Sequence, residues 1–241
     1  MKLKHLVIAS VAALLAAHVA FAADTQDAGE AQIIRNVAPL LKDLPIEKVT
    51  PSGHALLYEL LTPQGIVYTD KAGSFVIFGG AMIDTKTRVN LTEKRVDEMI
   101  NHKFSDFPLK DAIKVVRGNG SRVVITFEDP NCGYCKKLMQ EMNKLDNVTV
   151  YTFIIPILSP DSEVKAKEIW CSPSPAKTWT EYMASNEALP SNVPANCEVP
   201  FERNLALQRK LHVNGTPALY FKDNTSVKGY VTSSVLETKL R

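Results

Sequence analysis

Residues 127–135 read FEDPNCGYC, with two cysteines three positions apart directly after an apolar run. Cys132 and Cys135 fit half of a zinc site, a short structural disulfide, or a redox pair whose thiolate attacks other disulfides. For each of these alternatives, the rest of the chain must supply a different environment around the two cysteines. The segments around the motif therefore decide both the fold and the chemistry.

The segments next to the cysteines have the order of a βαβ unit. The pattern predicts a hairpin in which residues 113–117 pair with 122–127 across the Gly-Asn-Gly turn at 118–120. A helix is expected over 133–145, and the strongly apolar run 148–157 is typical of a strand buried on both faces. The remaining expected elements are a mainly helical stretch over 160–212, strands at 218–222 and 227–230, and a last helix from Ser233.

The segment before this unit has a different pattern, a helix followed by short strands. Apolar residues over 30–44 have helical spacing, and Pro39 is expected to kink or split that helix. A module of about 65 residues has a thin core and often gains stability by pairing. The run Phe78-Gly79-Gly80 ends an apolar strand that suits an edge meeting a second copy. Turn residues separate four expected antiparallel strands, at 46–50, 55–61, 65–69 and 74–78.

A helix beginning at Asn90 connects the two parts. Asn90 followed by Glu93 is typical of an N-cap with its acidic partner, and the sparse apolar stripe continues to Phe104. We therefore divide the chain into four segments. They are a leader at 1–22, an N-terminal module at 23–88, a linker helix with its connection at 89–112, and a second domain at 113–241.

The leader has the composition of a secretory signal peptide. Lys2 and Lys4 precede an apolar run over 6–19, and Ala20-Phe21-Ala22 forms a small-residue cleavage pattern. A membrane anchor needs about 20 apolar residues, more than this run provides. We predict export to the periplasm and cleavage after Ala22. Removal of the leader leaves 26 basic and 26 acidic residues, so net charge gives no support for nucleic acid as a partner.

The zinc and staple alternatives fit the spacing poorly. Zinc takes four ligands, usually as two closely spaced pairs, whereas Cys171 and Cys197 lie far apart and no histidine of the mature chain stands at ligand spacing. We expect no metal and no cofactor. A staple between Cys132 and Cys135 would close too short a loop to remove much chain entropy.

The redox alternative assigns a role to each cysteine. Cys132 at the first turn of a helix meets unpaired backbone N–H groups and the positive end of the helix dipole, which favour the thiolate. Such cysteines have pKa values of about 3.5 to 7.5 instead of roughly 8.5. Cys135, one turn further, is expected to be more buried and to attack a mixed disulfide from within. Cys171 and Cys197 are expected to form a structural disulfide in an oxidising compartment.

The second domain resembles the thioredoxin fold, in which a CxxC motif begins the first helix and Gly215-Thr216-Pro217 precedes a strand. More narrowly, almost the whole mature chain is similar to the periplasmic disulfide-bond isomerases of the DsbC and DsbG type. The motifs are CGYC at 132–135, Trp170-Cys171 with a later Cys197, and GTPA at 215–218. The dipeptide Gly133-Tyr134 favours the DsbC branch.

The resemblance implies an α+β fold with a cystatin-like N-terminal dimerisation module, a linker helix and a thioredoxin domain carrying a helical insertion. It also implies a V-shaped homodimer whose cysteine sites face a shared cleft, and a cis Pro217 packed against the cysteine pair. Sequence alone does not decide that isomer, because X-Pro bonds are mostly trans.

The chain departs from the thioredoxin pattern just before the motif. A thioredoxin has a buried aspartate six residues before its first cysteine, and Thr126 stands there. Asp129 or Glu128 is an alternative proton carrier for Cys135. The interpretation as a turn or capping residue is favoured for both.

We expect an enzyme that rearranges wrong disulfides in misfolded secreted proteins. Its Cys132 thiolate forms a mixed disulfide, which a substrate thiol or Cys135 then displaces. Isomerisation needs the reduced enzyme, so a membrane thiol reductase is implied as a partner. Tyr134 and the backbone of Thr216 are expected to pair with a substrate strand.

Two rival functions stay open at this point. A dithiol oxidase would donate its disulfide to new proteins, although the extra N-terminal module argues against it. A holdase for secreted proteins would bind chains while the cysteines are incidental.

Overall fold

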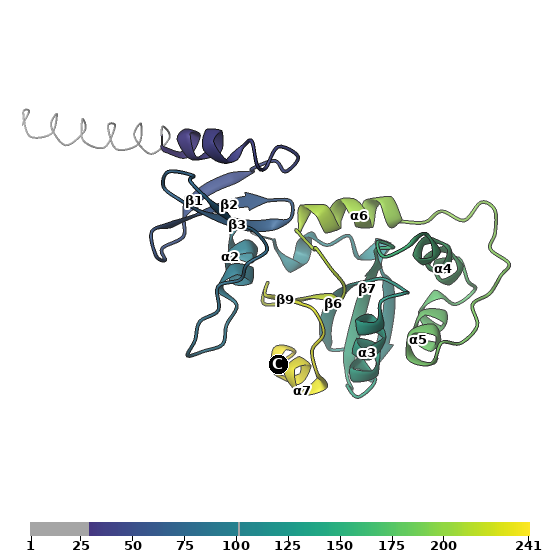
Figure 1. The fold of residues 1–241 in the computed structure, drawn as a ribbon. Helices are drawn as coiled ribbons and strands as arrows, with labels where there is room; N and C mark the ends of the chain where they lie inside the picture. The colour runs from purple at the N-terminus through teal and green to yellow at the C-terminus, as the bar shows by residue number, and fades with distance from the viewer. Residues whose placement is uncertain (1–28, 101) are drawn as a thin grey trace, which may run out of the picture. The chain divides into compact units, whose positions relative to one another are not determined.

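The computed structural model describes residues 29–100 and 102–241, which form two compact units divided between Arg88 and Val89 (Figure 1). The predicted leader and its cleavage site at Ala22 lie outside the described residues. Each unit contains its own sheet, of four and five strands. The α+β class is confirmed. Among the described residues, no helix has both the length and the apolar character needed to cross a membrane.

The first unit packs one helix on an antiparallel sheet. The helix covers residues 29–37, and its Ile33 and Val37 pack with Leu41 against Leu60 and Val67 of the sheet. The sheet has the order β1-β2-β3-β4, made of β1 (Lys48–Pro51), β2 (Leu57–Thr62), β3 (Gly65–Asp70) and β4 (Val76–Ile77). The expected helix and four strands are therefore present, with shifted ends.

Two of those shifts have local causes. The helix ends two residues before Pro39, because the residue preceding a proline is disfavoured in the helical region. The second strand begins at Leu57 instead of Ala55, because Ala55 and Leu56 take φ values of 47° and 58° in a turn. β4 is shorter than expected and pairs with β3 alone, so it lies at the edge of the sheet.

The second unit surrounds a mixed sheet of order β5-β7-β6-β8-β9. Its first helix begins after Asn90, whose side-chain oxygen accepts the Glu93 backbone N–H at 3.1 Å, so the predicted N-cap is confirmed. The helices are α2 (Leu91–Ile100), α3 (Gly133–Met142), α4 (Pro160–Trp170), α5 (Pro175–Ser185), α6 (Phe201–Lys210) and α7 (Ser233–Lys239), with 3-10 turns η1 (Phe104–Asp106) and η2 (Leu109–Asp111). The strands are β5 (Ile113–Arg117), β6 (Arg122–Glu128), β7 (Val148–Ile154), β8 (Ala218–Phe221) and β9 (Ser226–Lys228).

The predicted hairpin between β5 and β6 is wrong. β5 pairs antiparallel with β7, and β7 also pairs in parallel with β6, so β7 lies between the two strands that the Gly118-Asn119-Gly120 turn connects. The apolar residues of β7 are buried on both faces, and flanking strands on both edges satisfy its backbone as well. The turn instead packs on the start of β7: Asn119 N–H donates to the Asn147 side chain at 3.0 Å.

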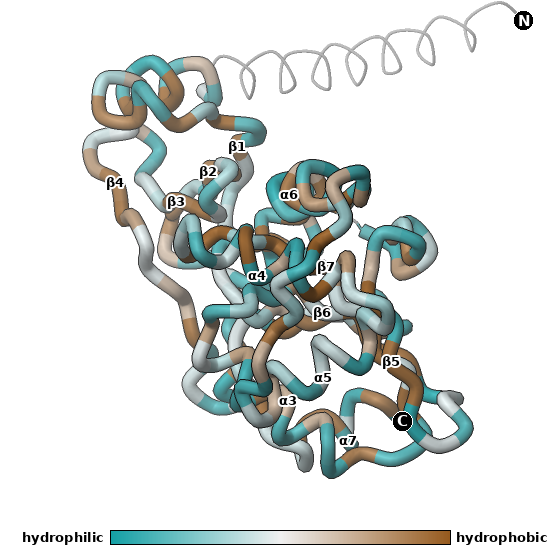
Figure 2. The backbone as a smooth tube through the Cα atoms, turned by 90° about the vertical axis from the view of Figure 1, so that its right-hand side faces the viewer, coloured by the Kyte–Doolittle hydropathy of each residue, from teal (hydrophilic) through white to brown (hydrophobic). Residues whose placement is uncertain are grey.

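Helices cover both faces of this sheet, as the alternation of side chains along the strands requires. Val124 of β6 packs with Leu138 of α3 and Leu236 of α7 on one face. The next residue, Ile125, points to the other face and packs with Phe107 and the segment after α6. In Figure 2 hydrophilic and hydrophobic residues alternate along these helices, as in helices with one buried side. The sheet therefore fixes where α3, and with it the cysteine motif, begins.

The helical insertion lies between β7 and β8. It contains α4, α5 and α6, separated at the proline-containing stretches that the sequence marks as interruptions. Cys171, which ends α4, and Cys197, which lies in the loop before α6, form a disulfide. The disulfide joins two points of the insertion that are 26 residues apart in sequence.

Candidate active site

The two remaining cysteines lie at the beginning of α3. Cys132 is the N-cap residue, and its sulfur accepts the backbone N–H of Cys135 at 3.4 Å. Both are free thiols in this structure, and Cys135 is completely buried. A sulfur at an N-cap accepts a hydrogen bond from a backbone N–H that has no acceptor within the helix.

The loop at Thr216 completes the site from the far end of the chain. The Thr216–Pro217 peptide bond is cis. The Cys132 thiol lies 3.3 Å from the Thr216 carbonyl oxygen, to which it donates when protonated. The Thr216 hydroxyl is buried beside the same sulfur. The structure thus brings Cys132, Cys135 and Thr216 together at one site.

The two sulfurs have opposite ionisation tendencies. The pKa of Cys132 is lowered to about 5, first by the hydrogen bond from the Cys135 thiol and also by the Thr216 hydroxyl and the backbone N–H groups of Cys135 and Tyr134, against the effect of burial. The pKa of Cys135 is raised well above its ordinary value, first by burial and then by the hydrogen bond that its thiol donates to Cys132. Cys132 is therefore a thiolate at neutral pH, and Cys135 stays a thiol.

Aromatic side chains border the nucleophile. Cys132 is only 6% exposed, whereas Tyr134 beside it is 59% exposed. The rings of Tyr134 and Tyr230 lie 6.5 Å apart. Gly133 between the cysteine and Tyr134 faces open space where a side chain would otherwise stand. Thus the nearly buried nucleophile is followed two residues later by an exposed tyrosine that pairs with a second aromatic ring.

The buried carboxylate of Asp129 organises the loop before the cysteines. Its Oδ2 accepts the backbone N–H groups of Ile157 and Leu158 at 2.8 and 3.0 Å. Its Oδ1 accepts the Asn131 N–H at 2.7 Å and the Ser162 hydroxyl at 2.8 Å. Asp129 therefore ties the cysteine loop to the segment after β7 and to the first turn of α4. Its interpretation as a turn residue is confirmed.

Glu128 has a different environment from its neighbour. It ends β6, is 3% exposed, and its Oε1 accepts the Thr126 hydroxyl at 2.7 Å and the Thr152 hydroxyl at 3.5 Å. Its Oε2 has no hydrogen-bond partner within the described residues. Burial, and next the charge on Cys132, raise the pKa of Glu128 to about 7, although both threonine hydroxyls oppose the rise. Turn or capping chemistry does not account for this residue, so that interpretation of Glu128 is wrong.

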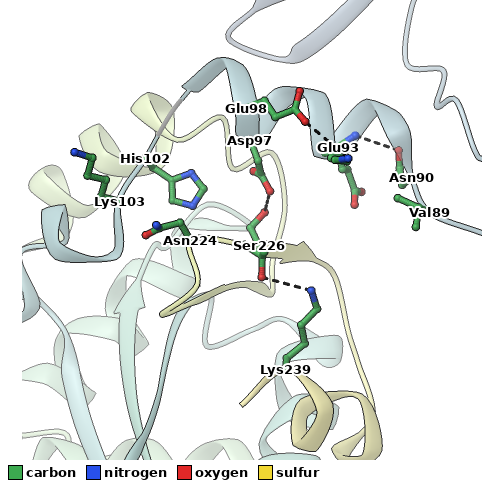
Figure 3. Close-up of a pocket in the computed structure, with 12 residues that line it drawn as sticks. Val89, Asn90, Glu93, Asp97, Glu98, His102, Lys103, Asn224, Ser226 and Lys239 are labelled. Atoms are coloured by element: carbon green, nitrogen blue, oxygen red, sulfur yellow. Dashed lines mark hydrogen bonds and ion pairs between the residues drawn. The ribbon is translucent and has the colours of Figure 1, made fainter. Parts of the chain in front are cut away.

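A pocket of about 550 Å³ lies elsewhere in this unit, between α2 and the β8–β9 turn (Figure 3). Asp97 of α2 accepts the Ser226 hydroxyl of β9 at 2.5 Å, and Lys228 of β9 lies 3.8 Å from Asp97. Lys239 and acidic residues of α2 line the same pocket, and neither Cys132 nor Cys135 does. These contacts fasten α2 to the five-stranded sheet and do not form part of the cysteine site.

Alkylation of Cys132 is expected to follow a midpoint near pH 5. Because only the thiolate reacts, the rate with iodoacetamide should fall about tenfold per pH unit below that value and level off above it. Cys135 should remain unmodified, since it is buried and its pKa is raised. The measurement is the rate of mass increase of the reduced protein between pH 3.5 and 9. A midpoint near the roughly 8.5 of an ordinary thiol would contradict the assigned hydrogen bonds.

Comparison with known proteins bears on the same two units. The family model of a thioredoxin-like domain matches residues 109–241, and that of the disulfide bond isomerase protein N-terminal domain matches residues 24–93. The probable thiol:disulfide interchange protein DsbC of Bordetella parapertussis is 42% identical over 198 residues, covering 82% of this chain and 68% of its own. The thiol:disulfide interchange protein DsbC of Escherichia coli is 31% identical over 224 residues, covering 90% and 88%. A crystal structure of a disulfide interchange protein from Neisseria gonorrhoeae, 36% identical, covers 56% of this chain and 99% of its own with a TM-score of 0.52.

Proposed function

Because the chain belongs to the DsbC family of thiol:disulfide interchange proteins, we propose that it rearranges non-native disulfides of secreted proteins through a mixed disulfide at Cys132. It is an enzyme of disulfide exchange. The observation that carries the residue-level proposal is the division of roles between the sulfurs. Cys132 has a pKa of about 5 while burial keeps Cys135 protonated.

Exchange begins when the Cys132 thiolate attacks one sulfur of a substrate disulfide. A new bond forms between Cys132 Sγ and that sulfur, the substrate disulfide breaks, and the second substrate sulfur leaves as a thiolate. A low pKa makes Cys132 available at neutral pH and also makes it a good leaving group afterwards. No metal or cofactor takes part in this scheme.

The mixed disulfide is resolved in one of two ways. A different thiol of the substrate attacks it and gives a new pairing, which is isomerisation. Alternatively Cys135 attacks Cys132 Sγ, which closes the CxxC disulfide and releases the substrate reduced. The exposed dipeptide Gly133-Tyr134 and the backbone of Thr216 lie at the sulfur and supply a place for an extended substrate strand.

Each release by Cys135 oxidises the enzyme, so a partner must return two electrons. We assign that task to a membrane thiol reductase that keeps Cys132 and Cys135 reduced. Because its proposed substrates are secreted proteins, we propose that the enzyme acts in the periplasm, in line with its family. Export by the leader and cleavage after Ala22 complete this part of the proposal.

The first unit is proposed to make the homodimer. β4 is an edge strand, and Phe75, Ile77 and Phe78 expose 46%, 42% and 56% of their surface there. A groove of about 330 Å³ beside it is lined by Val76, Phe78 and apolar residues that follow the helix. Pairing of the strand ending in Phe78-Gly79-Gly80 with its copy would satisfy the open edge and cover these side chains.

The test compares repair of scrambled disulfides by the full mature chain and by a chain beginning at Val89. The shortened chain should lose at least about tenfold in reactivation of scrambled ribonuclease, because two linked sites hold a misfolded chain at a high effective concentration. It should reduce a small aromatic disulfide within about twofold of the full chain, since the cysteine site lies wholly in the second unit.

Two point variants make the same comparison in the full chain. Phe78→Asp places a charge on the exposed edge and should cause the same selective loss together with a monomer mass in light scattering. Leu56→Asp changes an equally apolar residue that is 92% exposed in a turn of the same unit and should leave mass and repair unchanged. Full repair by a monomeric Phe78→Asp protein would contradict the paired-site proposal.

A further inference from the structure

The buried carboxyl of Glu128 stands at the end of β6, the strand that leads into the cysteine loop, and only one of its two oxygens is hydrogen-bonded. Thr126 and Glu128 are two apart on β6 and so share a face, and Thr152 of β7 stands opposite Thr126 in register. The two threonine hydroxyls reach only Oε1 of the carboxyl. The second oxygen, Oε2, is buried with no partner in the described chain. An ionisable group is costly to bury, so one left half-satisfied calls for an explanation.

The Glu128 carboxyl is close enough to the cysteine pair for their charges to interact. The Cys135 sulfur accepts the backbone N–H of Asp129, the residue that follows Glu128 directly. The charge of Glu128 contributes to the raised pKa of Cys135, and that of Cys132 contributes to the raised pKa of Glu128. The two sulfurs at the start of α3 are thus the titratable groups that interact with Glu128, while β7 contributes the uncharged Thr152 hydroxyl.

The neighbouring Asp129 does not compete for this role. Its two oxygens are occupied by four donors, from residues 131, 157, 158 and 162. Its carboxylate is therefore part of the loop scaffold. Among the residues that the structure describes, Glu128 is the buried carboxyl whose charge interacts with the sulfurs.

We infer that Glu128 is the proton acceptor for Cys135 when Cys135 releases a substrate from Cys132. This inference rests on the proposed function. The Cys135 proton passes to the Glu128 carboxylate, and the Cys135 thiolate attacks Cys132 Sγ. The disulfide between Cys132 and Cys135 forms, the bond from Cys132 to the substrate breaks, and the substrate sulfur leaves with the electron pair. When a reductase thiolate later opens the enzyme disulfide, Glu128 gives the proton back to Cys135.

The electrostatics of the site suit this timing. A carboxyl with a pKa of about 7 gives up and takes a proton with little driving force in either direction at neutral pH. Once Cys132 carries a substrate its negative charge is gone, and the contribution of that charge to the pKa of Glu128 disappears. The pKa of Glu128 then falls, which leaves it ionised at the stage when it must accept a proton.

The test separates the two chemical steps with an aromatic disulfide, 5,5′-dithiobis(2-nitrobenzoate), mixed with the reduced full chain. Attack by Cys132 releases a first coloured thiolate, and attack by Cys135 on the mixed disulfide releases a second. In Glu128→Gln the first step should change by less than about threefold, because Cys132 is retained. The second step should slow about a hundredfold at pH 7, the scale of losing a positioned proton acceptor. It should also lose the inflection that ionisation of Glu128 produces, which lies below pH 7 because the mixed disulfide has removed the charge of Cys132.

A second variant keeps the Glu128 carboxyl and raises its pKa. Thr126→Val preserves a β-branched shape in the strand but removes a hydrogen bond that lowers the pKa of Glu128, so the inflection of the second step should move to higher pH. A merely structural Glu128 would not move that inflection. Glu202→Gln, which alters an exposed acid on α6, is the matched control and should leave both steps unchanged.

Each outcome has a separate meaning. An unchanged second step in Glu128→Gln, or an unmoved inflection in Thr126→Val, overturns the inference. If Glu128→Gln fails to fold, the inflection in Thr126→Val decides alone. Absence of the first step in the unmodified protein would instead overturn the proposed role of Cys132, which is a different failure.

Discussion

Replacing Cys132 with alanine is expected to abolish repair of scrambled ribonuclease, with a loss of more than about a thousandfold, the scale of removing a covalent nucleophile. The reason is that Cys135 cannot substitute for it. Cys135 is completely buried, and its raised pKa leaves almost no thiolate at neutral pH. The measurement is the rate at which ribonuclease activity returns, with far-UV circular dichroism to verify the fold.

The matched control is Cys135→Ser, which keeps the nucleophile and removes the sulfur that releases it. Mixed disulfides between Cys132 and substrate should accumulate in this variant and be visible by mass after acid quenching. Repair of comparable rate in Cys132→Ala would contradict the proposal and favour a holdase, whose binding does not depend on sulfur. A different measurement addresses the oxidase alternative: a mostly reduced CxxC pair in cells quenched with acid would exclude it.

Replacing Asp129 with alanine is expected to destabilise the second unit by about 3 kcal/mol or more. Asp129 is fully buried, and its removal leaves the N–H groups of Asn131, Ile157 and Leu158 and the Ser162 hydroxyl without their acceptor. Each buried donor that loses its acceptor lowers the free energy of unfolding by about 1 to 3 kcal/mol, before the structure relaxes and water enters. The midpoint of thermal unfolding should therefore fall by roughly 6 to 12 °C for a unit of this size.

Asp161→Asn is the control for that variant. Asp161 also contacts Asn131, at 2.8 Å, but it is exposed and its other partner is Lys165 in a surface ion pair. Such pairs contribute about 0 to 1 kcal/mol, so the midpoint should hardly move. An equal effect of the two changes on calorimetric unfolding would show that Asp129 does not hold the loop.

The elements that the sequence predicts well are those whose signals are local. The apolar run of β7, the helix that begins at the CxxC motif and the N-cap at Asn90 each depend on residues a few positions apart, and the structure contains all three. Strand pairing is not local. A Gly-Asn-Gly turn favours a hairpin, yet the strand that pairs with β5 is β7, which becomes available only after α3 has crossed the sheet.

The site shows the same distinction. Spacing predicts that Cys132 lies at a helix start, but it does not separate two consecutive acids with opposite tasks. In the structure the strand geometry turns Glu128 inward beside Thr126, while Asp129 lies in the turn beyond. The period-two alternation of β6 was the available signal, because it places Glu128 on the same face as Val124 and Thr126 of a largely apolar strand.

The same chain contains one disulfide, between Cys171 and Cys197, and one pair of free thiols, Cys132 and Cys135. Formation of the disulfide in the insertion is an oxidation. Each catalytic cycle that ends in release by Cys135, in contrast, requires reduction of the cysteine pair at the start of α3. The organism must therefore oxidise one pair and reduce the other in the same molecule, and the complete burial of Cys135 limits the access of outside oxidants to the second pair.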